Sequence, residues 1–97
     1  MPSTYQGDHI AFGVSAAGAV RASPGRLVKI VVTTAGSAGT LTVNDNASAA
    51  TGSVLFAAPG TSAQGTIWLI DEPCENGIYV TPGTGQVLNV VHSDGPS

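Results

Sequence analysis

The sequence contains little charge. Its 97 residues include only three Lys or Arg and six Asp or Glu, or 9% charged residues, whereas 42% are hydrophobic. Typical soluble domains carry about 25% charged residues. A surface with so few charges has little electrostatic protection against association. We therefore expect a chain that packs against other copies or partners. The alternative is a monomer covered by the hydroxyl and amide groups of its plentiful Thr, Ser, Asn and Gln.

Basic residues are especially scarce, because Arg21, Arg26 and Lys29 are the only permanent cations. Binding to nucleic acid through its phosphates requires many clustered cations, so we predict no nucleic-acid partner. The sequence has no basic amphipathic stretch for a membrane surface, and its apolar runs are too short to cross a bilayer. The polar start, residues 1–8, lacks the basic and apolar regions of a signal peptide, and we expect synthesis in the cytoplasm.

Cysteine occurs once, as Cys74, so no disulfide can form within the chain. Glu72 and Glu75 lie close to it in sequence, and neighbouring carboxylates raise the pKa of a thiol. We therefore expect Cys74 to fill space in the core and not to act as a reactive thiolate.

Helix signals are also missing. No segment combines helix-forming residues with a 3.6-residue apolar repeat, and thirteen glycines and six prolines oppose helices. Short β-branched segments, separated by Gly, Pro, Ser and Asn, recur at a spacing of roughly ten residues. The pattern predicts an all-β fold, a single small antiparallel β-sandwich or jelly-roll-like barrel of about seven or eight short strands. The candidate strands are His9–Val14, Gly18–Ala22, Arg26–Thr34, Thr40–Val43, Ser53–Ala57, Ala63–Ile70, Gly77–Thr81 and Gln86–His92.

We expect one domain, residues 9–92, between a polar N-terminal arm, residues 1–8, and a polar C-terminal tail, residues 93–97. The arm is predicted to become ordered only on a partner, lying across a neighbouring subunit.

The strongest strand signal is Arg26–Thr34. Side chains alternate between the two faces of a strand. Val28, Ile30 and Val32 are all β-branched and are predicted to face the core, whereas Leu27 falls with Lys29 on a mixed face that is half-covered or meets a neighbour. The complete predicted core is Val28, Ile30, Val32, Leu41, Val43, Leu55, Ile67, Leu69, Ile78, Val80, Leu88 and Val90.

Two histidines, His9 and His92, lie near opposite ends of the chain. The termini of an antiparallel β fold can meet, so the two could form a pair, with Asp8 or Asp94 as a third metal ligand. No diagnostic spacing supports such a site, and we predict neither a metal nor a cofactor.

Acidic residues form two short groups. Asn44-Asp45-Asn46 resembles the start of a calcium loop, but the glycine and glutamate that complete such a loop are missing, so we interpret it as a turn. Asp71, Glu72 and Glu75 lie in a predicted loop, residues 71–76. A carboxylate pair can perform glycosidase chemistry, but a solvated turn or a docking contact to a basic partner fits one loop better. We predict that the protein is not an enzyme.

Aromatic residues number five, and Trp68 or Tyr79 could stack on a sugar if exposed beside Asn and Asp. With so few rings, most are needed for the core or an interface.

Two segments carry a resemblance to a known class of proteins. Gly25–Ser48 contains a strand ending in Ala-Gly and a second strand running into an Asp-Asn turn, and Asn76–Val91 reads as an Asn-Gly-Ile-Tyr-Val hairpin. From Gly25 to Val91 the chain resembles small virion proteins of tailed bacteriophages. The resemblance implies a β-sandwich or jelly-roll-like module, most of all a capsid decoration, or cement, protein. Tail and head-fibre proteins share this style, so a carbohydrate- or receptor-binding module on a fibre is the alternative.

These observations lead to one hypothesis: a structural virion protein that binds the outer capsid surface and stabilises the head by bridging capsid subunits. Its expected partners are the major capsid protein and copies of itself. A trimer is favoured because a capsid lattice has threefold positions. The protein is expected on the capsid surface of the virion, after synthesis in the host cytoplasm. The predicted partner-binding residues are Thr4, Tyr5, Asp8, Lys29, Asp71, Glu72 and Glu75.

Overall fold

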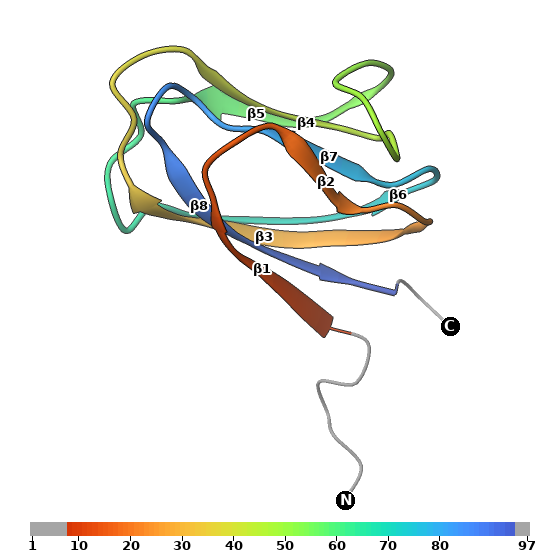
Figure 1. The fold of residues 1–97 in the computed structure, drawn as a ribbon. Coiled ribbons are helices and arrows are strands. Elements are labelled where there is room, and N and C mark those ends of the chain that lie inside the picture. The colour runs from red at the N-terminus through yellow and green to blue at the C-terminus, as the bar shows by residue number, and fades with distance from the viewer. Residues whose placement is uncertain (1–7, 95–97) are drawn as a thin grey trace, which may run out of the picture.

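The structure, a computed structural model, describes residues 8–94. These residues form eight strands and no helix, which confirms the all-β prediction (Figure 1). Each predicted strand segment overlaps one of them. The strands are β1 (Asp8–Val14), β2 (Gly18–Arg21), β3 (Gly25–Thr34), β4 (Thr40–Asn44), β5 (Val54–Pro59), β6 (Ile67–Cys74), β7 (Ile78–Thr81) and β8 (Val87–Ser93).

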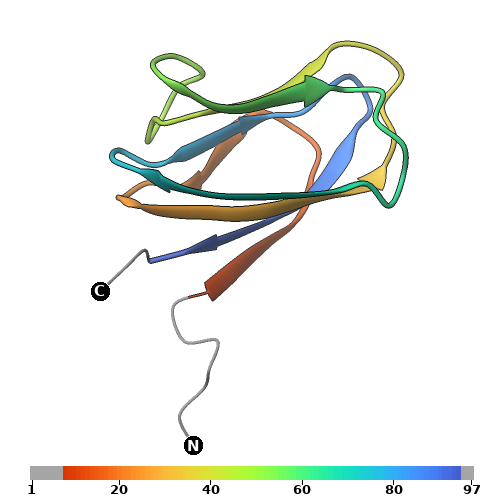
Figure 2. The ribbon, with the colours of Figure 1, turned by 180° about the vertical axis from the view of Figure 1, so that it is seen from behind.

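The strands form two antiparallel sheets that pack face to face (Figures 1 and 2). The first sheet has the order β1-β8-β3-β6, and the second sheet has the order β2-β7-β4-β5. Strand β1 therefore pairs with β8, β2 with β7, β3 with β6 and β4 with β5. This nested pairing of first with last strand, over two sheets of four, is the jelly-roll arrangement.

The core lies between the sheets. Ten hydrophobic residues there are at most 4% exposed, and burying each aliphatic side chain stabilises the fold by about 1.5–3 kcal/mol. Leu55, which was predicted to belong to the core, packs against it while partly exposed. The core residues are Leu27, Ile30, Val32, Leu41, Val43, Cys74, Ile78, Val80, Leu88 and Val90.

The prediction for the start of β3 was wrong. Leu27 is fully buried, whereas Val28 is only partly buried. Leu27 pairs with His92 and Lys29 with the adjacent Val91, so Val28 is an extra residue opposite β8. Such a bulge shifts the alternation of side chains by one position. Leu27 therefore shares the inward face with Ile30, and Lys29 points outward.

The prediction for β6 was also wrong, because two of its predicted core residues face solvent. Ile67 and Leu69 are 57% and 80% exposed, and the side chains that pack against the core are Trp68 and Ile70. The ring of Trp68 lies 5.1 Å from that of Phe56, centroid to centroid. All four residues from 67 to 70 are apolar, so the sequence pattern does not determine which pair faces inward.

The predicted loop 71–76 is also wrong in its first part, because β6 continues to Cys74. Pro73 is tolerated there since β6 is an edge strand that pairs only with β3. Asp71 has a positive φ of 54° and lies at a register shift between β6 and β3. This second bulge turns the Asp71 side chain toward solvent.

Candidate functional site

The outward side of the first sheet carries an unusual number of exposed apolar side chains. One row of register neighbours crosses all four strands: Ile10 pairs with Val91, and Lys29 pairs with Val91 on one side and with Leu69 on the other. Opposed residues lie on the same face of a sheet, so these side chains share the face that points away from the core.

This surface is apolar mainly at its two edges. On the edge strand β1, Ile10 and Phe12 are 50% and 74% exposed. On the opposite edge strand, β6, the exposed residues are Ile67 and Leu69. Among the described residues, the remaining large exposed hydrophobic residue is Val54 of the second sheet. We call this surface the outer apolar face, and it consists of Ile10, Phe12, Val31, Ile67, Leu69 and Val91.

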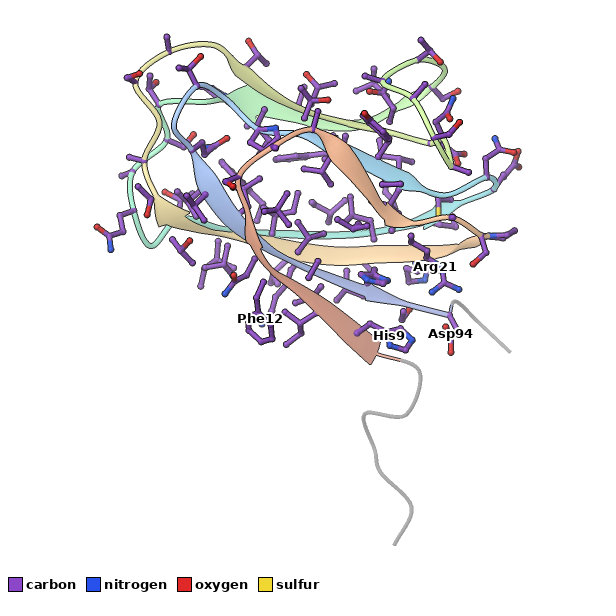
Figure 3. All side chains as sticks on the ribbon, viewed as in Figure 1. His9, Phe12, Arg21 and Asp94 are labelled. Atoms are coloured by element: carbon purple, nitrogen blue, oxygen red, sulfur yellow. The ribbon has the colours of Figure 1, made fainter. Side chains whose placement is uncertain are left out.

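A bulge interrupts β1 at Phe12 and Gly13. Ala11 pairs with Val90 and Val14 with Leu88, so β1 has one residue more than β8 over this interval. Gly13 takes a φ of 63°, which glycine adopts without a steric cost, and its N–H donates to the Asn89 side chain at 3.1 Å. Figure 3 shows the Phe12 ring pointing away from the sandwich.

Lys29 lies within the outer apolar face. Arg21 and Arg26 form ion pairs, but Lys29 has none among residues 9–94. Its side chain is half-buried between its neighbours on β8 and β6. A lysine of this kind lays its aliphatic stem along apolar surface while its ammonium group reaches outward.

Charge gathers at one end of the sandwich, where β3 and β7 begin and β6 and β8 end (Figure 1). Five acidic residues with described side chains lie there, and the sixth, Asp8, begins β1 at the same end, opposite Ser93. The loops at the opposite end, residues 35–39, 60–66 and 82–86, contain no charged residue. We call these regions the charged end and the neutral end. The charged end comprises Arg21, Arg26, Asp45, Asp71, Glu72, Glu75 and Asp94.

Asp45 joins two loops of the charged end. Its carboxylate accepts backbone N–H hydrogen bonds from Glu75 at 3.0 Å, from Asn76 at 2.8 Å and from Gly77 at 3.3 Å. Burial acts to raise the pKa of Asp45, but these three donors together outweigh it and lower the pKa below 3.8. The turn predicted at residues 44–46 is present, and it also anchors the acidic segment.

The two histidines meet, as the sequence allowed. His9 and His92 are cross-strand partners with ring centroids 5.3 Å apart. His9 Nε2 and Arg21 Nη1 each lie 3.1 Å from Asp94 Oδ1 (Figure 3). Arg21 also donates to the Pro24 carbonyl at 2.8 Å. This cluster ties together the start of β1, the end of β2 and the end of β8.

Burial lowers the pKa of His92, and the nearby His9 and Arg21 lower it further, against the opposing effect of Asp94. Hydrogen bonds from His9 and Arg21 in turn lower the pKa of Asp94. Between residues 9 and 94 no three His, Cys, Asp or Glu side chains are grouped so as to hold a metal ion. The hydrogen bonds and ion pairs of this cluster hold the ends of the three strands together.

The predicted partner-binding residues do not form one cluster. Lys29 lies on the outer apolar face, whereas Glu72 and Glu75 lie at the charged end, Glu72 on β6 and Glu75 in the following turn. Asp71 lies at the border between the two, where its Oδ1 accepts a hydrogen bond from Arg26 at 3.0 Å. Asp8 begins β1. Thr4 and Tyr5 lie outside the described residues.

Sequence reasoning missed Ile10 and Phe12 as surface residues. The signal was present in β1, where the small Ala11 alternates with these two large side chains and marks the side that packs on the core.

Comparisons with protein-family models, with curated proteins and with solved structures find no match. No membrane-spanning helix is found in the part of the chain that the structure describes.

Proposed function

We propose that the protein is a structural virion protein that binds the outer surface of a capsid and bridges neighbouring capsid subunits. The observation that carries the proposal is the division of its surface. The charged end, the neutral end and the outer apolar face differ in charge and polarity, so each suits contact with a different neighbouring protein. A protein embedded in a lattice has a fixed orientation, and such a division serves that role.

The fold is compatible with this role. Jelly rolls of eight strands recur in viral capsid domains and also in lectins. This support is an analogy at the level of the fold, since one fold serves many functions. The resemblance of residues 25–91 to small phage virion proteins favours the capsid over the lectin alternative.

The charged end is the proposed contact with the capsid. Glu72 and Glu75 form no ion pair among the described residues, whereas Asp71 and Asp94 are paired with arginines. The carboxylates of Glu72 on β6 and of Glu75, whose backbone N–H is held by Asp45, would meet a basic surface. Each such contact is weak, but repetition over a lattice multiplies its effect.

The carbohydrate-binding alternative has less support. It requires exposed rings of Trp68 or Tyr79 beside polar side chains. Both residues are half-buried, and Trp68 packs on Phe56.

Fractionation of particles on a density gradient, with quantification of this chain by mass spectrometry, tests the proposal. Co-migration with the most abundant particle protein, at a near-equal or simple-fraction copy number, supports a lattice-bound protein. A few copies for each particle would place it on a tail or fibre and contradict the capsid contact, and absence from particles would overturn the proposal.

The charged-end contact has its own test. The double substitution Glu72→Gln and Glu75→Gln is expected to weaken binding to particles a few-fold and to reduce its salt dependence, because rim charges contribute mainly through long-range attraction. Gln64→Glu, which adds a charge at the neutral end, is the matched control and is expected to bind like the unmodified protein. Equal binding by all three proteins would contradict this contact.

A further inference from the structure

We propose that the outer apolar face is the contact between two copies of this chain, related by a twofold axis. The inference goes beyond the proposed function, because it concerns a different surface and applies to the free protein. It rests on the exposure of the face, on its area and on its charges.

The exposed residues leave a large apolar surface without a cover. Phe12 and Leu69, on opposite edges of the first sheet, are 74% and 80% exposed, and the central Val31 and Val91 continue the apolar surface between them. Isolated exposed hydrophobic residues are normal, but a contiguous apolar patch marks an interaction site. The patch reaches from one edge strand to the other through Ile10, Val91, Val31 and Ile67, and Lys29 and Asn89 are the polar positions within it.

The area suffices for a stable dimer. A specific contact buries about 800 Å² on each partner. The chain has a total accessible surface of 5105 Å², so such a contact would cover about a sixth of it. The protein measures 41 × 30 × 17 Å along its principal axes, and the outward side of the first sheet is one of the two broad sides of the sandwich (Figures 1 and 2), so its dimensions allow a contact of about 800 Å².

The distribution of charge favours a second copy as the occupant. Two charged ends would repel each other, because acidic residues outnumber arginines there. The outer apolar face lacks this obstacle, since Arg26 and Asp71 at its border neutralise each other and, within residues 9–94, Lys29 is its one charge without an ion pair.

A twofold contact also has a partner for Lys29. In such a contact, residue i of one copy meets residue j of the other, and j meets i. Asp71 uses Oδ1 to accept from Arg26, and its Oδ2 accepts no hydrogen bond among the described residues. The ammonium group of Lys29 can therefore pair with Asp71 of the partner subunit, and the twofold axis repeats this pair, so that each dimer contains two.

Sedimentation velocity of the purified full chain, over a range of concentrations, tests the inference. The unmodified protein is expected to form dimers. Ile67→Lys should raise the dimer dissociation constant by about tenfold or more, because it places a charge in the outer apolar face. Val54→Lys is the matched control: both residues are β-branched and lie on edge strands, and they are 57% and 58% exposed, but Val54 belongs to the second sheet. The control is expected to dimerise normally.

A second variant separates contact through the whole face from contact through one edge. Phe12→Lys, on the opposite edge strand, should also give monomers. Circular dichroism establishes that each variant is folded. A second measurement uses the unmodified protein and therefore does not depend on whether the variants fold. Hydroxyl-radical labelling of Phe12 and Leu69 should fall as the protein concentration rises, while labelling of Val54 stays constant.

A monomer at all concentrations would overturn the inference, as would a dimer that persists in Ile67→Lys or in Phe12→Lys. A trimer would also overturn it, because three copies do not share a twofold contact. None of these results depends on particles, so the outcome is independent of the test of capsid binding.

Discussion

At the neutral end of the sandwich the loops are joined by their backbones, whereas at the charged end they are joined by carboxylates and guanidinium groups. At the neutral end, Gly36 donates to the Gly60 carbonyl at 3.0 Å and Thr84 donates to the Ala38 carbonyl at 2.9 Å. At the charged end, Asp45 accepts three backbone N–H groups, and Arg21 holds Asp94. The same fold is thus closed in two different ways.

This difference predicts which substitutions and which changes of pH or salt should destabilise each end. The neutral end depends on close approach of backbones: a Cβ placed on Gly83 would lie 2.5 Å from the Cα of Gly60. Its loops contain no charged group, so pH and salt should hardly affect them. Close backbone approach also occurs at the charged end, where a Cβ on Gly77 would lie 2.5 Å from the carbonyl oxygen of Arg21, but the contacts there depend on protonation as well. Substitutions that remove charge and changes of pH should therefore separate the two ends.

The largest effect is expected for Gly83→Ala. The added methyl group would meet two backbone groups, the Cα of Gly60 and, at 2.9 Å, the carbonyl oxygen of Ala38, neither of which can rotate away. We expect the free energy of unfolding to fall by about 3 kcal/mol, as overpacking in a rigid site does. Denaturation in urea measures it. Gly18→Ala is the control, because nothing lies within 4 Å of its Cβ position, and it should change stability little. Equal stability of the two variants would show that the neutral end is not closely packed.

The next effect is expected for Asp45→Ala. Removing the carboxylate leaves three backbone N–H groups without their acceptor, and hydrogen bonds to a charged group contribute roughly 1.5–3 kcal/mol to stability. We expect a loss of about 2 kcal/mol near pH 7, and a smaller loss for Asp45→Asn, which keeps one acceptor oxygen.

The pH dependence of that loss gives a second check. The pKa of Asp45 is lowered in the folded protein, so its contribution is present above pH 3.8 and disappears as the pH falls through the folded pKa. The stability difference between the unmodified protein and Asp45→Ala should therefore shrink in acid. A difference that stays constant from neutral to acidic pH would contradict the role of the carboxylate charge.

The sequence was sufficient to predict the fold, because alternation and turn residues act locally and repeat eight times. It was not sufficient to place side chains next to a bulge. Nothing in Arg26–Thr34 distinguishes a regular strand from one with an extra residue at Val28, so Leu27 was assigned to the wrong face. In Ile67–Ile70 every residue is apolar, and only the packing of Trp68 against Phe56 decides which pair faces inward.

The candidate surfaces were predictable to different degrees. Lys29 on an outward face and the meeting of His9 with His92 follow from strand alternation and antiparallel topology. The anchor formed by Asp45 does not, because its partners are backbone N–H groups about thirty positions away, and backbone groups leave no signature in a sequence. The same limit applies to the charged end as a whole, which exists only once the loops are brought together.

The smallest effect is expected for the titration of His92, which sharpens the comparison without breaking the fold. Burial, followed by His9 and Arg21, lowers the pKa of His92 below 6.5 in the folded protein. As the pH falls through 6.5, the unfolded chain binds a proton before the folded one does, so the free energy of unfolding decreases until the folded histidine is protonated as well.

His92→Leu should remove this pH dependence of the free energy of unfolding, and it also removes Nδ1, a buried atom without a hydrogen-bond partner among the described residues. His9→Gln should keep most of the slope, because burial is the larger cause. Unfolding curves between about pH 7 and pH 5 measure it. Hydrogen exchange over the same range should show faster opening of β1 and β8 at the charged end and unchanged protection in residues 82–86; equal acceleration at both ends would mean that the two ends do not differ in their response to protons.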